Sequence, residues 1–257
     1  MLDLSIKYYF ILAFRCIVMY NKYIEKILFY IILCYKIIAE REHMIINVAH
    51  TKGGVGKTTI AVNLAIEMNS DLFDLDNQNS SYNFSLLSDI PRSIHFWKDR
   101  EMLKNIIQIY RDNPDKHIII DSGGYDSNIS REIILNSNII ITPITVSQTE
   151  VDGLQKFYIE NVEIALQSNP NIRPYILLNR INHYDKKDAE DLITFIKSAV
   201  PDYKVLKISL GARKDYKKAF SEGKSVVEYN RTSPASKETI SLKKEIEQII
   251  KTIVKEN

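Results

Sequence analysis

The sequence predicts an α/β fold in which helices cover both faces of a parallel β-sheet. Short apolar runs, rich in β-branched residues, recur along the chain, as expected for strands that are buried on both faces. Segments with helical apolar spacing separate these runs, and this alternation is typical of a parallel sheet with crossover helices. At 257 residues and 45% hydrophobic content, the chain suits one such domain, or one domain with an appendage.

The first expected strand leads into a glycine-rich segment, which is the strongest functional signal in the chain. Residues 44–49 read MIINVA, 51–59 read TKGGVGKTT, and 60–68 have helical apolar spacing. A strand, a glycine turn and a helix are the context of a phosphate-binding loop. The glycines let successive N–H groups converge on a phosphate at the helix N-terminus, where the helix dipole favours negative charge. Lys57 then reaches the β- and γ-phosphates, and the Thr58 hydroxyl can bind Mg²⁺.

The form of this loop resembles the deviant Walker A motif of the ParA/MinD family, a SIMIBI-like class of P-loop NTPases. Thr51 stands where G-x-x-x-x-G-K-[ST] has its first glycine, and Lys52 lies inside the loop. The resemblance covers about residues 44–250, so we expect an ATPase domain over 44–257. It implies an ATP and Mg²⁺ site in which Lys52 and Lys57 act catalytically, with Lys52 reaching the phosphates of a second subunit. The loop residues expected to hold the nucleotide are Gly53, Gly54, Val55, Gly56, Lys57, Thr58 and Thr59.

Two further expected strands end in acidic residues. Residues 71–78, DLFDLDNQ, resemble the family's D-x-D-P-Q segment, and by that match Asp76 would orient or activate the attacking water. The alternative is that Asp74 and Asp76 only cap the next helix. The strand over 116–121 resembles a Walker B strand, so Asp121 would hold Mg²⁺ together with Thr58, most simply through water.

The strand expected over 173–180 ends in Asn179, whose amide offers both a donor and an acceptor. These match the N6/N7 edge of adenine, and the resemblance assigns that contact to Asn179. A plain turn asparagine is the alternative. Further elements are expected as helices over 102–109, through 133–135, over 154–165 and over 236–254, and as strands over 138–143 and 203–209.

The C-terminal third is basic on an otherwise near-neutral domain. From Tyr203 onward there are 13 Lys and Arg against 7 Asp and Glu. An arginine, a helix with aromatic and alanine residues, and then G-x-x-V-x-E over 223–228 resemble the partition ATPases of the family. Such a basic stripe can bind DNA phosphates, or it can be only a solvated face. The candidate DNA-binding residues are Arg213, Lys214, Lys217, Lys218 and Lys224.

The resemblance is strongest to the small ParA-type partition ATPases, and it implies their cycle. Two subunits would form a homodimer around ATP, bind DNA without sequence preference, and leave it when a ParB-like centromere-binding protein stimulates hydrolysis. The expected location is the cytoplasm, on the nucleoid, where plasmid or chromosome copies would be moved apart.

Two rival functions share the loop. A MinD-like membrane-associated positioning ATPase needs a terminal membrane-targeting helix, but here Glu245 and Glu247 accompany Lys243 and Lys244. That composition suits docking on the domain better than binding an anionic membrane, so a membrane partner is not expected. A bacterial tyrosine kinase would carry a terminal tyrosine cluster, and no tyrosine follows Tyr229.

Residues 1–43 form an apolar N-terminal extension with a different composition. Its longest uninterrupted apolar run is nine residues, over 27–35, whereas a membrane span needs about 20. Three interpretations stay open: a surface or partner-binding helix, a helix packed on the domain, or a segment that is not translated because Met44 is the start. We favour the last, because Met44 opens directly onto the first strand. Both cysteines, Cys16 and Cys34, lie in this extension, which excludes a cysteine-ligated cluster in residues 44–257.

Overall fold

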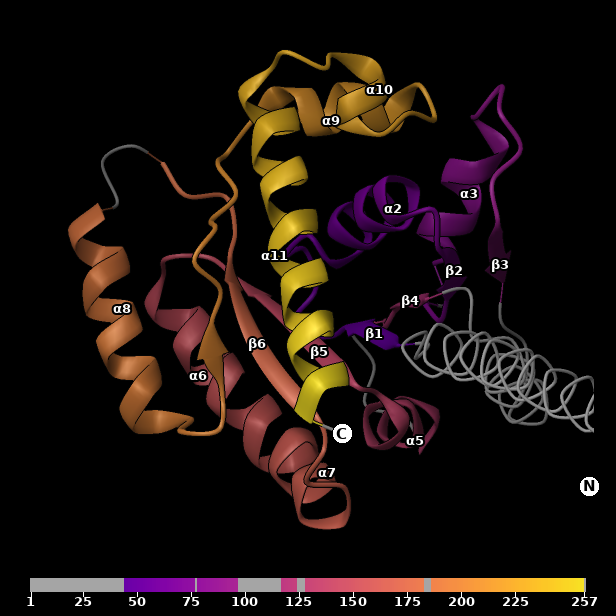
Figure 1. The fold of residues 1–257 in the computed structure, drawn as a ribbon. Coiled ribbons are helices and arrows are strands. Elements are labelled where there is room, and N and C mark those ends of the chain that lie inside the picture. The colour runs from indigo at the N-terminus through magenta and orange to yellow at the C-terminus, as the bar shows by residue number, and fades with distance from the viewer. Residues whose placement is uncertain (1–43, 77, 97–116, 124–127, 183–185, 257) are drawn as a thin grey trace, which may run out of the picture. The chain divides into compact units, whose positions relative to one another are not determined.

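The structure is a computed structural model that describes residues 44–76, 78–96, 117–123, 128–182 and 186–256 (Figure 1). The predictions for the extension 1–43 and for a helix over 102–109 lie outside the described residues and stay predictions. Among the helices of the described part, none combines the length and the apolar character that crossing a membrane requires.

The described residues form a seven-stranded parallel sheet in the order β3-β2-β4-β1-β5-β6-β7. The predicted fold class is therefore confirmed. The register pairs Asp121 with both Val48 and Asp74, so the ends of the three neighbouring strands meet at one edge. The strands are β1 (Ile45–Val48), β2 (Asp71–Asp74), β3 (Ile94–Phe96), β4 (Ile118–Asp121), β5 (Ile139–Ile144), β6 (Arg173–Leu178) and β7 (Lys204–Val205).

Helices cover both faces of this sheet. The helix predicted over 154–165 lies in a longer helical segment that a π-helical turn, η1, interrupts, so it is not one regular helix. The helices are α2 (Lys57–Met68), α3 (Ser80–Leu86), α5 (Asn128–Asn136), α6 (Gln148–Phe157), η1 (Tyr158–Val162), α7 (Glu163–Ser168), α8 (Lys186–Ala199), α9 (Lys214–Ser221), α10 (Val226–Tyr229) and α11 (Pro234–Glu256).

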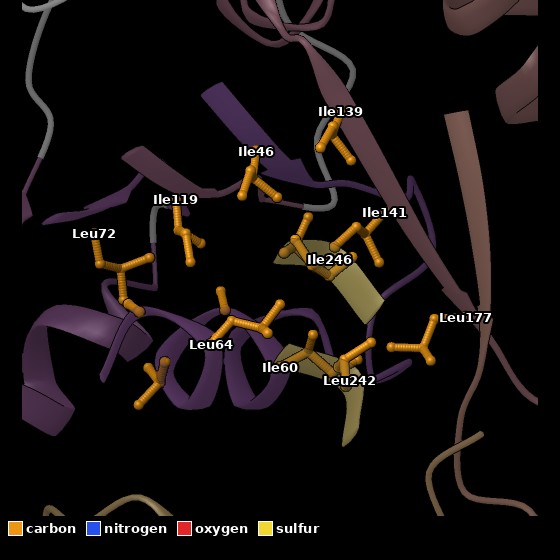
Figure 2. Packing of buried hydrophobic residues seen from close by; sticks show 14 of the residues in the cluster. Ile46, Ile60, Leu64, Leu72, Ile119, Ile139, Ile141, Leu177, Leu242 and Ile246 are labelled. Carbon is orange, nitrogen blue, oxygen red and sulfur yellow. The ribbon is translucent and has the colours of Figure 1, made fainter. Parts of the chain in front are cut away.

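The main hydrophobic core lies between the sheet and helices α2 and α11. Figure 2 shows Ile46, Ile119 and Ile141 from three strands together with Leu64 of α2 and Ile246 of α11. On the other face, side chains of β5 and β6 pack against α6, η1 and α8. Because both faces are buried, the strands read as continuous apolar runs rather than as alternating ones.

The last strand is shorter than the sequence predicts. The apolar pattern predicts a strand over 203–209, but β7 holds only Lys204–Val205. Glu245 of α11 accepts the N–H groups of Lys207 and Ile208 at 2.8 and 3.0 Å, so a side chain takes the Ile208 donor that a longer strand would direct at β6. The sequence prediction of this strand's length is therefore wrong, because a distant carboxylate competes with strand pairing.

Candidate nucleotide-binding site

The phosphate loop joins β1 to α2 and needs glycine at two positions. Gly54 and Gly56 have φ angles of 78° and 99°, in the left-handed region that favours glycine. A Cβ atom on Gly56 would also lie 2.4 Å from Nδ2 of Asn179. That amide donates to the Val55 carbonyl at 2.7 Å, so the residue that follows β6 holds the loop in place. The loop geometry thus depends on a contact between residues 124 positions apart in the chain.

Lys57 lies folded back across this loop. Its side chain is buried, and its Nζ donates to the Lys52 carbonyl at 2.9 Å. Burial lowers the pKa of Lys57, while the charges of Asp121 and Asp76 oppose that change. The Lys57 ammonium therefore contacts the backbone of Lys52, and both predicted carboxylates lie close enough to act on that ammonium group.

His50 also supports the loop, although no sequence motif marks it. Its Nδ1 accepts the N–H of Lys52 at 3.1 Å, and its ring stacks on Phe157 with centroids 5.6 Å apart. Burial, together with the charges of Lys57 and Lys52, lowers the pKa of His50 to about 4. His50 is therefore a neutral imidazole at physiological pH, and it fixes the backbone of Lys52 through its unprotonated nitrogen.

Asp121, at the end of β4, is fully buried beside the end of β1. Its Oδ2 accepts the Ser81 hydroxyl at 2.6 Å, and its Oδ1 is buried without a hydrogen-bond partner among the described residues. Burial raises the pKa of Asp121 to about 7, whereas the hydroxyls of Ser81 and Thr58 and the charge of Lys57 act in the opposite direction. The predicted metal residues Thr58 and Asp121 are thus brought together.

The Asp121 carboxylate, whose Oδ1 has no hydrogen-bond partner among the described residues, and the Thr58 hydroxyl near this carboxylate together fit Mg²⁺. This ion prefers oxygen ligands and usually keeps several waters, with one or two protein groups and substrate phosphates completing its shell. Within the described ranges there is no group of three or more His, Cys, Asp or Glu residues that could hold a metal ion alone. The donor set therefore suits an ion that arrives with the nucleotide rather than one held in an all-protein cage.

Asp74 and Asp76 have different surroundings. Asp74 is fully buried and accepts the N–H groups of Tyr82 and Asp76 at 3.0 and 2.9 Å, so it caps α3, as the alternative interpretation proposed. Burial raises its pKa. Asp76 is half-buried and accepts the N–H of Gln78 at 3.0 Å in a local turn. Only the carboxylate of Asp76 is therefore partly open at the edge of the site.

Asn179 has both amide atoms engaged with backbone. Its Nδ2 donates to Val55, and its Oδ1 accepts the N–H of Arg180 at 2.9 Å. In this structure Asn179 anchors the phosphate loop, and the adenine contact stays a prediction.

The amino-acid sequence of the chain is similar to those of known nucleotide-binding proteins. The family described as the CobQ/CobB/MinD/ParA nucleotide binding domain (CbiA) matches residues 46–226. The chain belongs to this family. The Maintenance of carboxysome distribution protein A of Halothiobacillus neapolitanus is 23% identical over 224 residues, which cover 84% of this chain and 99% of that protein. An uncharacterised protein of Methanocaldococcus jannaschii is 28% identical over 246 residues, which cover 75% and 94%.

Solved structures of such proteins share the fold. Apo McdA of Cyanothece superposes with a TM-score of 0.60 at 18% identity, covering 79% of this chain and 99% of that one. The cell division ATPase MinD of Pyrococcus furiosus has a TM-score of 0.56 at 16% identity, covering 80% and 99%. The protein is thus a nucleotide-binding domain of the ParA/MinD family of ATPases, and the predicted family is confirmed.

In this ParA/MinD-type ATPase, the five predicted DNA-binding residues lie on and around α9. They fall into two groups. Arg213 binds Glu238 with an N–O distance of 2.7 Å, and the Nζ of Lys224 lies 2.9 Å from Glu222. The other group has exposed side chains and no ion pair within the described residues. It consists of Lys214, Lys217 and Lys218.

The G-x-x-V-x-E segment of the family has a structural explanation here. Gly223 has a φ of 63°, and a Cβ on it would lie 2.4 Å from the backbone N of Ser88. Val226 is fully buried, and Glu228 binds Arg92 at 2.8 Å while it completes a capping box at the start of α10. The three motif residues therefore fix α10 against the chain that precedes β3.

The helix that begins at the phosphate loop also holds α10. Asn63 of α2 donates to the Thr59 carbonyl at 2.7 Å and accepts the N–H of Val226 at 2.9 Å. One turn further along α2, Glu67 accepts the Ser225 hydroxyl at 2.9 Å. We call α9, α10 and the loop between them the C-terminal layer. This layer is attached to α2 through buried polar contacts.

Proposed function

We propose that the protein is a Mg²⁺-dependent ATPase that dimerises on ATP and then binds DNA without sequence preference. A ParB-like centromere-binding partner would stimulate hydrolysis and so release the dimer, moving plasmid or chromosome copies apart. In this proposal the protein works in the cytoplasm, on the nucleoid.

One observation carries the nucleotide half of the proposal. Groups that come from the ends of β2 and β4 and from the phosphate loop converge at one sheet edge, where ligands of open α/β folds bind. They include a buried lysine, a hydroxyl, a buried carboxylate with a free oxygen and a second, partly open carboxylate. These are Lys57, Thr58, Asp121 and Asp76.

Each group has a role in the proposed reaction. Lys57 would exchange the Lys52 carbonyl for the β- and γ-phosphate oxygens, and Thr58 and Asp121 would hold Mg²⁺. When bound, Mg²⁺ neutralises the charge that develops on the phosphates. Asp76, whose carboxylate is partly open, would orient the attacking water. The side chain of Lys52 would reach the phosphates of the second subunit, so the proposed active form is the dimer.

The DNA half of the proposal rests on the C-terminal layer. Lys217 and Lys218 lie exposed on adjacent positions of α9, one turn from Lys214. Like charges at helical spacing repel by a few tenths of a kcal/mol, and phosphates would relieve that repulsion. Phosphate contacts made by two copies of this surface would give binding that depends on the dimer, and so on ATP, without reading bases.

The alternative, a MinD-like ATPase that acts on a membrane, has less support. Such a protein needs a free amphipathic helix at its C-terminus, but α11 buries Leu242, Ile246 and Ile250 in the main core. Undocking this helix would expose those side chains, each worth about 2 kcal/mol. We therefore favour DNA over lipid as the surface that the dimer binds.

The test is co-sedimentation with DNA and, separately, with anionic liposomes, each with ATP and Mg²⁺ over a salt series. The wild type should bind DNA with ATP only, more weakly as salt increases, and should leave the liposomes in solution. A Lys217→Glu/Lys218→Glu variant should hydrolyse ATP normally but lose most DNA affinity and show a flatter salt dependence. Full DNA binding by this variant would place the contact elsewhere, and liposome binding by the wild type would favour the alternative.

Two loop variants separate the ATPase cycle from the DNA surface. Lys57→Ala should lose nucleotide binding, and DNA binding with it. Asp76→Ala should bind ATP and DNA but hydrolyse slowly, because the attacking water loses its partner. Normal turnover in Asp76→Ala would leave Asp76 as a turn residue only.

A further inference from the structure

Ser81 contacts Asp121, the carboxylate that is proposed to bind Mg²⁺. No sequence motif marks Ser81 as a functional residue. Its hydroxyl donates to Oδ2 of Asp121 at 2.6 Å, and both residues are fully buried. A hydrogen bond from a hydroxyl to a charged carboxylate is about twice as strong as a neutral hydrogen bond. The contact spans 40 positions in sequence and joins α3 to the end of β4.

The partner of Ser81 differs from that of several other serines on helices. A serine in a helix commonly donates to a carbonyl of the preceding turn. Ser85, Ser198 and Ser221 do so, with partners at 2.6 to 2.8 Å. Ser81 lies in the first turn of α3 and donates instead to Asp121, which lies in a different element of the fold.

The neighbouring cap fixes where Ser81 points. Asp74 binds the N–H of Tyr82, so the first turn of α3 is held over the ends of β2 and β4. With Oδ2 of Asp121 held by Ser81, the carboxylate can no longer rotate freely. Its second oxygen, Oδ1, then stays buried without a hydrogen-bond partner among the described residues, and so remains available.

We propose that Ser81 is a positioning residue for the Mg²⁺ site. It orients Asp121 so that Oδ1 faces the ion's ligand shell, and it ties that orientation to α3, which follows the turn containing Asp76. The inference rests on the proposed function in one respect, namely that Asp121 holds Mg²⁺. Groups that orient metal ligands in this way commonly change metal affinity about 10-fold or more when removed.

The experiment measures binding of a fluorescent ADP analogue to the full chain during a Mg²⁺ titration, and again in EDTA. For Ser81→Ala we expect the Mg²⁺ concentration for half-maximal tight binding to increase about 10-fold, with affinity in EDTA unchanged. Ser81→Thr keeps the hydroxyl and should return the titration close to wild type. Ser85→Ala is the matched control, because Ser85 lies in the same helix but donates to its own turn.

The other outcomes contradict either the positioning role of Ser81 or the magnesium part of the proposed function. A Ser81→Ala titration that matches the wild type overturns the positioning role. So does an equal loss of affinity in EDTA, since that would indicate a general effect on the loop. Ser81→Cys, which fills the site but is a weak donor, replaces the alanine variant if that one does not fold, and the same two results would overturn the inference. Wild-type binding without any Mg²⁺ dependence would instead refute the magnesium part of the proposed function.

Discussion

The nucleotide edge of the sheet and the C-terminal layer differ in how their charged residues are held. At the nucleotide edge, Lys57 and Asp121 are buried and fixed by specific partners. In the C-terminal layer, Lys217 and Lys218 are exposed on α9 without an ion pair in the described part of the chain. A buried charge is costly unless its surroundings are arranged for it, so its presence indicates a site. An exposed charge costs little free energy, so its presence alone is weak evidence for a binding site.

The first prediction tests the nucleotide edge where its geometry is tightest. Gly56→Ala should lower nucleotide affinity about 100-fold, because strain at a positive φ adds to the clash with Asn179. The control is Gly53→Ala, since a Cβ there meets nothing within 4 Å and its φ is not in the left-handed region. Isothermal titration with ADP and Mg²⁺ measures both. Similar affinities for the two variants would show that this part of the loop is not rigid.

The second prediction makes the same change in the C-terminal layer. Gly223→Ala should lower the free energy of unfolding by about 2 kcal/mol, because it strains a φ of 63° and pushes a methyl group against the backbone near Ser88. Nucleotide affinity should stay within about twofold of the wild type, since only α10 is displaced. Urea unfolding gives the first quantity and titration the second. A large loss of affinity would show that the two regions are coupled more tightly than the contacts of Asn63 imply.

The sequence could predict most of the sheet for a clear reason. Strands β1, β4, β5 and β6 are buried on both faces, so each leaves a continuous apolar run that differs little from the expected bounds. The predicted elements do not include helix α8, although Leu192 and Ile196 have helical apolar spacing. The end of β7 left none, because Glu245 competes for its N–H groups from another element.

In the candidate site, too, the sequence does not reveal contacts between residues that are distant in the chain. The lysines and the carboxylates Asp76 and Asp121 lie in contiguous motifs and were predicted. His50 and Ser81 act through contacts that form only when distant segments meet, and their residue types are common in any role. For Asn179 the strand end was predicted, whereas its bond to the Val55 carbonyl could not be read from the sequence.

The third prediction concerns pH and the buried His50. Its pKa falls from 6.5 in the unfolded chain to about 4 in the folded one, so between these values the unfolded state binds more protons. Stability from this residue is present above pH 6.5 and is lost as pH falls toward 4. On acidification from pH 7 to 5.5, the wild type should lose about 1 kcal/mol more than His50→Asn, which cannot titrate. Parallel stability profiles by urea unfolding would show that His50 is not held neutral.

The last prediction has the smallest effect and divides the five basic residues of the proposed DNA surface. Arg213 binds Glu238, which also accepts the N–H of Gly211 at 3.0 Å. Arg213→Gln should therefore cost about 0.5 kcal/mol of stability, typical of an exposed ion pair, and should change DNA affinity little, because its charge is already neutralised.

Lys217→Gln, the matched change on α9, should affect DNA affinity rather than stability. It removes like-charge repulsion and no ion pair, so stability should stay the same or increase slightly. DNA affinity should fall and its salt dependence should flatten by about one counterion per subunit, as expected for a lost phosphate contact. Equal losses of DNA affinity in Arg213→Gln and Lys217→Gln would mean that DNA breaks the ion pair with Glu238. In that case, exposure and pairing in the free protein would be a poor guide to which cations bind DNA.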